Sequence, residues 1–300
     1  MVKIKVAING FCRVGRSVFK IAQSRSDIEI AAIRTHLSAE QCAYLLKHDS
    51  IYGHYAKAIG TGDASLYVGD RIIPIISDKR TTKLPWDDLG IDVLIDAGCQ
   101  TDAAELRRHR TAGARRVASL SQCADFATIV MGVNEETYDP AKHHIISNGS
   151  CTTNCLAPVA KVLSREFGIV RGMMTTIHSY TNDQHLVDSV HKDLRRARCA
   201  TQSIIPTSTG AAQAVALVLP ELKGKFTGMA LRVPTPNVSM TDLVAVLEKS
   251  VTKEEANGAL KKWAEGTLKG ILAYSEDATV SSDYISDTHS SIVDALDTQV

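Results

Sequence analysis

A cysteine at the midpoint of the chain is the residue best suited to covalent chemistry. Cys151 lies in the run Ser147–Pro158, written SNGSCTTNCLAP. The apolar residues His144–Ser147 predict a strand that ends just before this run. Apolar residues at spacings near three and four predict a helix from Thr152 to about Phe167. The pattern therefore places Cys151 at a strand-to-helix junction.

A helix N-terminus stabilises a thiolate over a thiol, because its unpaired N–H groups and partial positive charge favour an anion. Cys151 is therefore a candidate nucleophile, with hydroxyl groups beside it on Ser150, Thr152 and Thr153. The same position also suits a buried structural cysteine, and Cys155, one helical turn further on, is expected to be one.

Residues that could assist this cysteine follow it in the chain. The predicted strand Val170–His178 ends in a histidine, which could form an ion pair with the thiolate and act as acid or base. The chain has 10 histidines, so spacing alone does not settle the pairing. Pro206–Gly210 leads into a predicted helix at Ala211–Leu219, and hydroxyl and N–H groups at such a start form an anion pocket.

The first residues predict a βαβ unit, with strands at Ile4–Ile8 and Ile28–Ile33 and a helix between them. Gly10 and Gly15 match the dinucleotide fingerprint, but Cys12 replaces the glycine that lets the backbone approach a pyrophosphate. A tight strand-to-helix turn would explain the same glycines.

The second strand ends in Arg34-Thr35, where an NAD site carries an acidic residue for the ribose hydroxyls. Arginine and threonine bind a 2′-phosphate, so this pair favours NADP over NAD. The alternative is a solvated arginine after a strand.

Strands continue to alternate with helices through the first half, which indicates an α/β fold with a Rossmann-type, doubly wound parallel sheet. The second half mixes strands and helices and predicts an α+β catalytic domain. We expect a dinucleotide-binding domain at 1–150 and a catalytic domain at 151–300. The further expected strands are within 57–76, at 91–96, 117–120, 128–131, 226–233 and 243–247, and the further helices at 39–46, 101–111 and 252–268.

Bulk properties exclude several classes of protein. With 34 Lys+Arg against 33 Asp+Glu, the net charge of +1 gives no general attraction to nucleic acid or membrane. We find no signal peptide and no apolar run of membrane-spanning length. The 7 scattered cysteines indicate free thiols in a reducing compartment, and hence a cytoplasmic protein without a metal site.

The run Ser150–Pro158 resembles the active-site signature of phosphorylating glyceraldehyde-3-phosphate dehydrogenases, and the resemblance extends over essentially the whole chain. The other matching segments are 8–11, 45–50, 131–134, 178–184, 191–198, 206–212 and 232–237.

The resemblance implies oxidation of D-glyceraldehyde 3-phosphate to 1,3-bisphosphoglycerate, a step of glycolysis, in a homotetramer. Cys151 would form a thiohemiacetal and then a thioester, with His178 as its acid–base partner. The substrate phosphate would bind Thr181, Asp183 and Arg232; inorganic phosphate would bind Ser150, Thr152, Thr209 and Gly210. The cofactor, NADP or NAD, would contact Gly10, Phe11, Arg13, Val14, Arg34, Thr35, Arg80 and Ser121.

The chain also departs from the family pattern. Besides Cys12 and Arg34-Thr35, Ser189-Val190 replaces a Leu-Pro pair that crowds the cofactor ribose, which again favours NADP. Asp96–Cys99 replaces the segment beside the adenine. Relatives continue beyond the position of Val300 with a strand, an asparagine for the nicotinamide amide and a helix, so a strand edge and an apolar groove are expected to be exposed.

Two other functions fit the same residues. An erythrose-4-phosphate dehydrogenase shares Cys151 and His178, but is not expected to keep Thr181–Gln184 and Pro206–Gly210 in this form. An inactive or regulatory homologue would keep the fold and account for the altered fingerprint.

Overall fold

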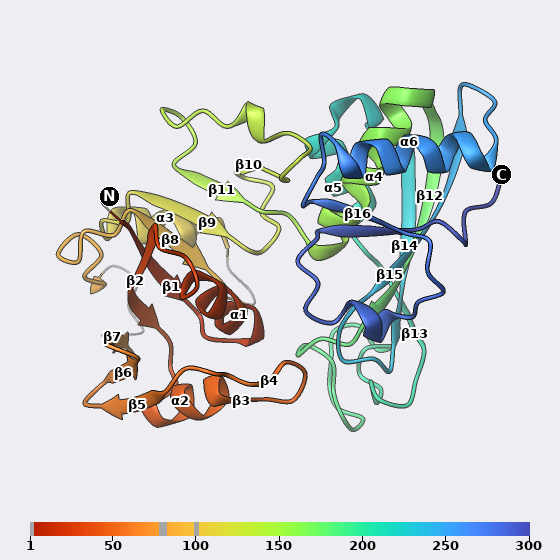
Figure 1. Cartoon of the computed structure of the whole chain (residues 1–300). Coiled ribbons are helices and arrows are strands. Elements are labelled where there is room, and N and C mark those ends of the chain that lie inside the picture. Colours follow the sequence, from red (N-terminus) through yellow and green to blue (C-terminus); the bar gives the residue numbers. More distant parts are fainter. Residues whose placement is uncertain (1–2, 78–82, 99–101) are drawn as a thin grey trace. The chain divides into compact units, whose positions relative to one another are not determined.

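The computed structural model describes residues 3–77, 83–98 and 102–300 of the chain. They form two compact units (Figure 1). The first extends to Ile129 and includes Thr137–Gly149, and the second contains Val130–Glu136 and Ser150–Val300. Arg80 and Cys99 lie outside the described residues.

The first unit is built on a sheet with the strand order β10-β11-β9-β8-β1-β2-β7-β6-β5. All pairings from β10 to β7 are parallel, whereas β7-β6 and β6-β5 are antiparallel. This arrangement confirms the predicted doubly wound α/β fold. The strands are β1 (Ile4–Asn9), β2 (Ile28–Arg34), β5 (Ile59–Gly62), β6 (Ser65–Val68), β7 (Arg71–Ile76), β8 (Val93–Asp96), β9 (Arg116–Ser119), β10 (Ala127–Thr128) and β11 (Ile145–Ser147).

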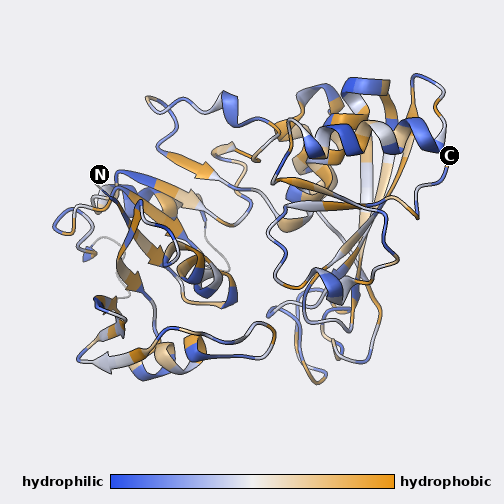
Figure 2. Cartoon of the chain, viewed as in Figure 1, coloured by the Kyte–Doolittle hydropathy of each residue, from blue (hydrophilic) through white to orange (hydrophobic). Residues whose placement is uncertain are grey.

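Helices cover both faces of this sheet because the strands are apolar on both sides. On β1, Ile8 packs in one core with Phe19 of helix α1 (Arg13–Ala22) and Leu46 of helix α2 (Ala39–Lys47). Ala7, which points to the opposite face, packs in a second core with Leu106 of helix α3 (Ala103–Thr111). Figure 2 shows the strands mainly in hydrophobic colours and the connecting loops mainly in hydrophilic ones.

The chain reverses its direction across the sheet between β1 and β8. It adds β2 and β7 on one side of β1, and then returns to add β8 and β9 on the other. Such a switch point leaves a crevice at the carboxyl ends of the strands, where doubly wound folds bind ligands. Asn9 and Asp96 end these two strands opposite each other.

The second unit contains a sheet with the order β13-β14-β12-β15. Helices α4 and α5 pack on one face of this sheet, where Met174 meets Leu156 and Val215. Helix α6 packs against α4, as Leu260 and Val162 share a further core. The elements are α4 (Cys151–Phe167), β12 (Ile169–Ser179), β13 (Ile205–Thr207), α5 (Ala211–Val218), β14 (Phe226–Val233), β15 (Met240–Leu247), α6 (Lys253–Glu265), β16 (Leu272–Ser275) and β17 (Ser291–Asp294).

The other face of this sheet is apolar and exposed. Met173 and Val244 are paired across β12 and β15, and their exposed fractions are 51% and 62%. Met240 and Val246 add exposed fractions of 58% and 45% on β15. Their neighbours in sequence point inward, as period-two alternation requires.

Some elements differ from the prediction. The expected strand 128–131 is only a two-residue pairing, because Val130 is buried in the core of the second unit. Helix α6 ends at Glu265 before Gly266, a poor helix former, while Leu268 remains fully buried in the following turn. Strands β13, β16 and β17 and the hairpin of β3 (His48–Asp49) and β4 (Gly53–His54) were not predicted, because they are too short to show a period.

Candidate active site

Helix α4 starts at Cys151, immediately after a tight turn. Gly149 adopts a φ of +69°, a conformation that a side chain disfavours. Ser150 is the N-cap, and its hydroxyl accepts a hydrogen bond from the Thr153 N–H at 3.0 Å. This cap fixes the first turn of the helix and leaves the Cys151 side chain exposed.

The histidine at the end of β12 lies against this cysteine. His178 Nε2 is 3.3 Å from Cys151 Sγ. Its Nδ1 is 2.6 Å from the carbonyl oxygen of Ser179. A carbonyl only accepts hydrogen bonds, so Nδ1 carries a proton and Nε2 is the nitrogen that can take the thiol proton. The ring is buried, which holds it in this orientation.

Several groups act on the acidity of the Cys151 thiol. Burial among the surrounding atoms raises its pKa. The hydrogen bond and charge of His178, together with the hydroxyl and N–H of Thr152, outweigh this effect, so the pKa lies below that of an ordinary thiol. The pair therefore favours the thiolate, the form of cysteine that attacks an electrophile.

A polar cluster lies near the same pair. Arg232, at the end of β14, donates from Nη1 to Thr181 Oγ1 at 2.7 Å and to the Ser179 carbonyl at 3.2 Å. The Thr181 hydroxyl in turn donates to the Asp183 carboxylate. Burial and then Arg196 lower the pKa of Arg232, and the charges of Asp183 and Cys151 oppose this. A cation beside a hydroxyl suits a phosphate group.

Arg196, which the sequence placed only within the matching segment 191–198, also belongs to this cluster. Its Nη1 donates to Asp183 at 2.8 Å, and its Nε donates to Thr207 Oγ1 at 3.0 Å. Its side chain is only 20% exposed. The Thr207 hydroxyl also donates to Asp193 at 2.7 Å. No local signal marks Arg196, because its hydrogen-bond partners Asp183 and Thr207 lie 13 and 11 residues away in the chain.

The residues predicted for inorganic phosphate lie at two helix starts. Ser150 and Thr152 belong to the start of α4, where Thr152 is buried. Thr209 and Gly210 precede α5, and Thr209 Oγ1 accepts the Ala211 N–H at 3.2 Å. Helices α4 and α5 share a core, so both starts belong to one packed body.

In the first unit, the fingerprint glycines fit a dinucleotide turn. Gly10 adopts a φ of +92°, and a Cβ there would lie 2.9 Å from the Ala97 carbonyl oxygen. A Cβ on Gly15 would lie 2.2 Å from the Gly10 carbonyl oxygen. Both positions therefore require glycine, so that β1 can turn into α1 at the switch point.

The start of α1 is suited to an anion. Cys12 is the N-cap, but its thiol makes no cap and donates instead to the Ala97 carbonyl at 3.3 Å. The first turn holds no acidic residue, and Arg13 and Val14 are exposed there. The Phe11 ring packs inward against Phe19, which leaves its backbone to line the turn. These residues fit a pyrophosphate at the helix N-terminus.

The residues predicted for the ribose end of the cofactor lie at strand ends. Arg34 ends β2 and donates to Asn9 Oδ1 at 2.9 Å, with Glu105 at 3.4 Å. Thr35 is buried, and its hydroxyl accepts the Leu37 N–H. Ser121 follows β9 and donates to the Gly98 carbonyl at 3.1 Å. All of them lie at the carboxyl edge of the sheet, which suits a dinucleotide.

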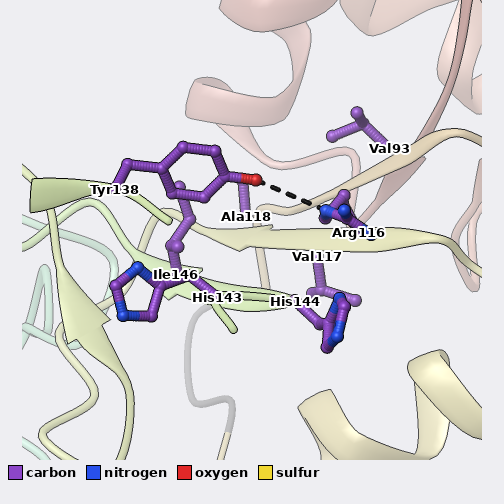
Figure 3. Close-up of a pocket in the computed structure, with 8 residues that line it drawn as sticks. All are labelled: Val93, Arg116, Val117, Ala118, Tyr138, His143, His144 and Ile146. Carbon is purple, nitrogen blue, oxygen red and sulfur yellow. Dashed lines mark hydrogen bonds between the residues drawn. The ribbon is translucent and has the colours of Figure 1, made fainter. Parts of the chain in front are cut away.

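A hollow of about 150 Å³ lies at the opposite edge of this sheet (Figure 3). Val93 and Arg116, which begin β8 and β9, line it together with Tyr138. Arg116 Nε donates to the Tyr138 hydroxyl at 3.3 Å and its Nη2 to the Pro140 carbonyl at 2.7 Å. Since Asp96 and Ser119 end the same strands, this hollow is separate from the candidate dinucleotide residues.

Two absences hold for residues 3–77, 83–98 and 102–300, the part of the chain that the structure describes. No helix there is both long and apolar enough to cross a bilayer. Over the same residues, no three His, Cys, Asp or Glu side chains are grouped as a metal ion would need.

Comparison with known proteins gives matches to both halves of the chain. Residues 4–103 match the family described as glyceraldehyde 3-phosphate dehydrogenase, NAD binding domain, and residues 150–300 match its C-terminal domain. The chain is 55% identical to a glyceraldehyde-3-phosphate dehydrogenase of Geobacillus stearothermophilus over 299 residues, which is 99% of this chain and 89% of that protein. Identity is 52% to those of Priestia megaterium and Bacillus subtilis, with the same coverage.

Proposed function

The chain belongs to the glyceraldehyde-3-phosphate dehydrogenase family, and we propose that it oxidises D-glyceraldehyde 3-phosphate to 1,3-bisphosphoglycerate with inorganic phosphate and a nicotinamide dinucleotide. The observation that carries the proposal is the 3.3 Å contact between Cys151 Sγ and His178 Nε2, whose Nδ1 proton is held by the Ser179 carbonyl. An acyl-transfer nucleophile needs such an oriented base.

In the proposed reaction, the Cys151 thiolate attacks the aldehyde carbon and the new alkoxide takes a proton from His178, which gives a thiohemiacetal. His178 then removes this hydroxyl proton as the carbon is oxidised to a thioester. The nicotinamide ring, when bound, supplies the acceptor for the hydride that leaves this carbon. Inorganic phosphate finally attacks the thioester carbonyl, the C–S bond breaks, and Cys151 leaves as a thiolate.

The two phosphates of the reaction would bind at two sites in the second unit, the polar cluster of Arg232 and the starts of α4 and α5. We assign the substrate phosphate to the cluster of Thr181, Asp183 and Arg232, in which Arg232 supplies the cation and Thr181 the hydroxyl that contact the anion. Asp183 would hold Arg196 in place rather than contact the anion. The attacking phosphate is assigned to hydroxyl and N–H groups at Ser150, Thr152, Thr209 and Gly210.

The cofactor would bind at the carboxyl edge of the first sheet, with its pyrophosphate on Gly10, Phe11, Arg13 and Val14 and its adenosine end toward Arg34, Thr35 and Ser121. We propose that it accepts NADP as well as NAD, because Arg34 supplies a cation where an acidic residue would repel a 2′-phosphate.

We also propose a homotetramer. The exposed apolar face of the second sheet, with Met173 and Val244 at its centre, would be covered by another copy of the chain. The loop around 180–203 presents Leu186, Val190 and Leu194 with exposed fractions of 70%, 94% and 81%. A Met173→Asp variant should shift the molar mass in sedimentation toward a smaller species, whereas an unchanged mass would count against this face.

Absorbance of the reduced nicotinamide tests the activity with aldehyde, phosphate and either cofactor. Cys151→Ser should lower turnover by at least about a thousandfold. The matched control is Cys155→Ser, one helical turn away, where the thiol lies 3.6 Å from the Ser291 hydroxyl; it should keep most of the activity. Faster turnover with D-erythrose 4-phosphate would favour the other dehydrogenase, and no turnover with any aldehyde or cofactor would contradict an enzymatic role.

A further inference from the structure

A carboxylate that the sequence did not associate with the cofactor lies beside Arg34. Glu105, in the first turn of α3, places Oε1 3.4 Å from Arg34 Nη1. The two side chains are only 25% and 16% exposed, so the pair is partly withdrawn from solvent. Partial burial strengthens the attraction between these charges relative to an exposed surface pair.

The first turn of α3 fixes the position of Glu105. The N-cap Asp102 accepts the Glu105 N–H at 2.7 Å, so the backbone of Glu105 is held at the third position of the helix. On the opposite side of the ion pair, Asn9 accepts a hydrogen bond from Arg34 and donates one to Asp96 at 2.6 Å. Arg34 is therefore held between α3 and the ends of β1 and β8.

Among the residues that the structure describes, Arg108 and His109 also face the Glu105 carboxylate. Arg108 Nη1 lies 3.1 Å from Oε2, but its side chain is 54% exposed. His109 Nε2 lies 3.9 Å from Oε1, and the ring is fully buried, with Nδ1 accepting the Trp86 indole N–H at 3.1 Å. Burial lowers the pKa of His109 to about 4, so it is neutral at physiological pH. The negative charge of Glu105 is therefore balanced by arginines, with Arg34 as the less exposed of the two.

We propose that Glu105 is a specificity-determining residue, which pairs with Arg34 and so limits the preference of this chain for a cofactor with a 2′-phosphate. This inference depends on the proposed function, because it assumes that the adenosine end of a dinucleotide binds at Arg34. A 2′-phosphate carries negative charge toward Arg34 and is repelled by Glu105, whereas the ribose hydroxyls of NAD carry none. The acidic residue missing from the end of β2 is thus supplied by α3.

Removal of the negative charge of Glu105 should therefore change the affinity mainly for ligands that carry a 2′-phosphate. Glu105→Gln keeps the shape of the side chain. It should raise the affinity for NADP about tenfold and change the affinity for NAD by less than about threefold. The same contrast should hold between adenosine 2′,5′-bisphosphate and 5′-AMP, which differ only in the phosphate at issue. Calorimetric titration of the full chain measures all four ligands without turnover.

Control variants distinguish an effect of the Glu105–Arg34 pair from an effect of net charge or of misfolding. Asp63→Asn makes the same charge change at an exposed turn of the same unit and should leave all four affinities unchanged. In an Arg34→Met background, Glu105→Gln should raise the NADP to NAD affinity ratio by a smaller factor, because only the direct repulsion between the carboxylate and the 2′-phosphate is then relieved. If Glu105→Gln fails to fold, Glu105→Asp withdraws the carboxylate by one methylene and should shift the ratio in the same direction.

The outcomes distinguish the inference from the proposed function. An unchanged or smaller NADP to NAD affinity ratio in folded Glu105→Gln overturns the inference. A ratio that rises by the same factor in the Arg34→Met background overturns the pairing with Arg34. Failure of the unsubstituted chain to bind any of the four ligands would instead contradict the proposed dinucleotide site, and with it the premise of this inference.

Discussion

His178→Asn should raise the pKa of the Cys151 thiol without removing the support of the site. An asparagine can keep the hydrogen bond to the Ser179 carbonyl that His178 Nδ1 makes at 2.6 Å. It lacks an atom equivalent to Nε2, which lies 3.3 Å from Cys151 Sγ. Because burial raises the pKa of Cys151 and His178 provides the main opposing effect, the thiol should titrate at higher pH in the variant.

The size of the effect follows from the distance between the two groups. Opposite unit charges 3.3 Å apart attract by about 5 kcal/mol at an effective dielectric constant of 20 and about 1 kcal/mol in water. Neighbouring atoms partly desolvate the Cys151 sulfur, but the residue is open to solvent, so the lower part of this range applies. A thiol of higher pKa is also intrinsically more nucleophilic, which offsets part of the loss. We therefore expect alkylation at neutral pH to slow by about tenfold.

Iodoacetamide labelling of Cys151, followed by peptide mass across a pH series, measures this directly and needs no cofactor. His289→Asn is the control, since His289 pairs with Asp287 and makes no contact with the cysteine. The labelling midpoint should move to higher pH only in His178→Asn. Equal midpoints and equal rates in all three proteins would refute the argument that His178 holds the thiolate. Turnover should fall further than labelling, by about 10²–10⁴, because the general acid and base is also lost.

Three further predictions test other parts of the site and the fold. Arg232→Met should raise the KM for the phosphorylated aldehyde by about tenfold or more and leave a non-phosphorylated aldehyde little changed, as steady-state kinetics can measure. Gly10→Ala should destabilise the chain by about 1–3 kcal/mol and weaken dinucleotide binding in denaturant and calorimetric titrations, since its Cβ would meet the Ala97 carbonyl. Burial favours the neutral form of His109, so its contribution to the free energy of unfolding should be complete above pH 6.5. The free energy of unfolding should fall by about 3 kcal/mol as the pH drops from 6.5 to about 4. Urea titrations across this range should show a smaller fall in His109→Gln, and an equal fall would contradict the assignment.

The parts of the fold that the sequence predicted correctly are those with a local cause. The helix expected from Thr152 to about Phe167 is α4, Cys151–Phe167, because its apolar spacing and its serine cap act within a few residues. The parallel sheet followed from alternating strands and helices. Strands were also expected within 57–76, but the antiparallel pairing of β5, β6 and β7 there was not predicted. The short strand β13 forms because it pairs with β14, and no local sequence pattern indicates this pairing.

In the candidate site, too, the residues with a local sequence signal were predicted and those set by tertiary packing were not. The sequence singled out Cys151, which is marked by its own neighbours, and could not settle which of the histidines lies beside it. Arg196 was missed because its contacts to Asp183 and Thr207 depend on how a long loop folds back. Such a loop has no period, so its side-chain contacts are set only by tertiary packing.

Arg34 has contacts in the structure that its residue type and position in the sequence did not indicate. The sequence presented it as a cation for a phosphate. The structure adds that its guanidinium bonds Asn9, whose amide bonds the fully buried Asp96, and that it pairs with Glu105. Buried carboxylates are costly unless hydrogen-bonded and balanced, so Arg34 also stabilises the carboxyl ends of β1, β2 and β8. Loss of NADP binding in an Arg34 variant would therefore reflect both roles, whereas Glu105→Gln leaves the Asn9 and Asp96 contacts in place and is the more selective test of cofactor preference.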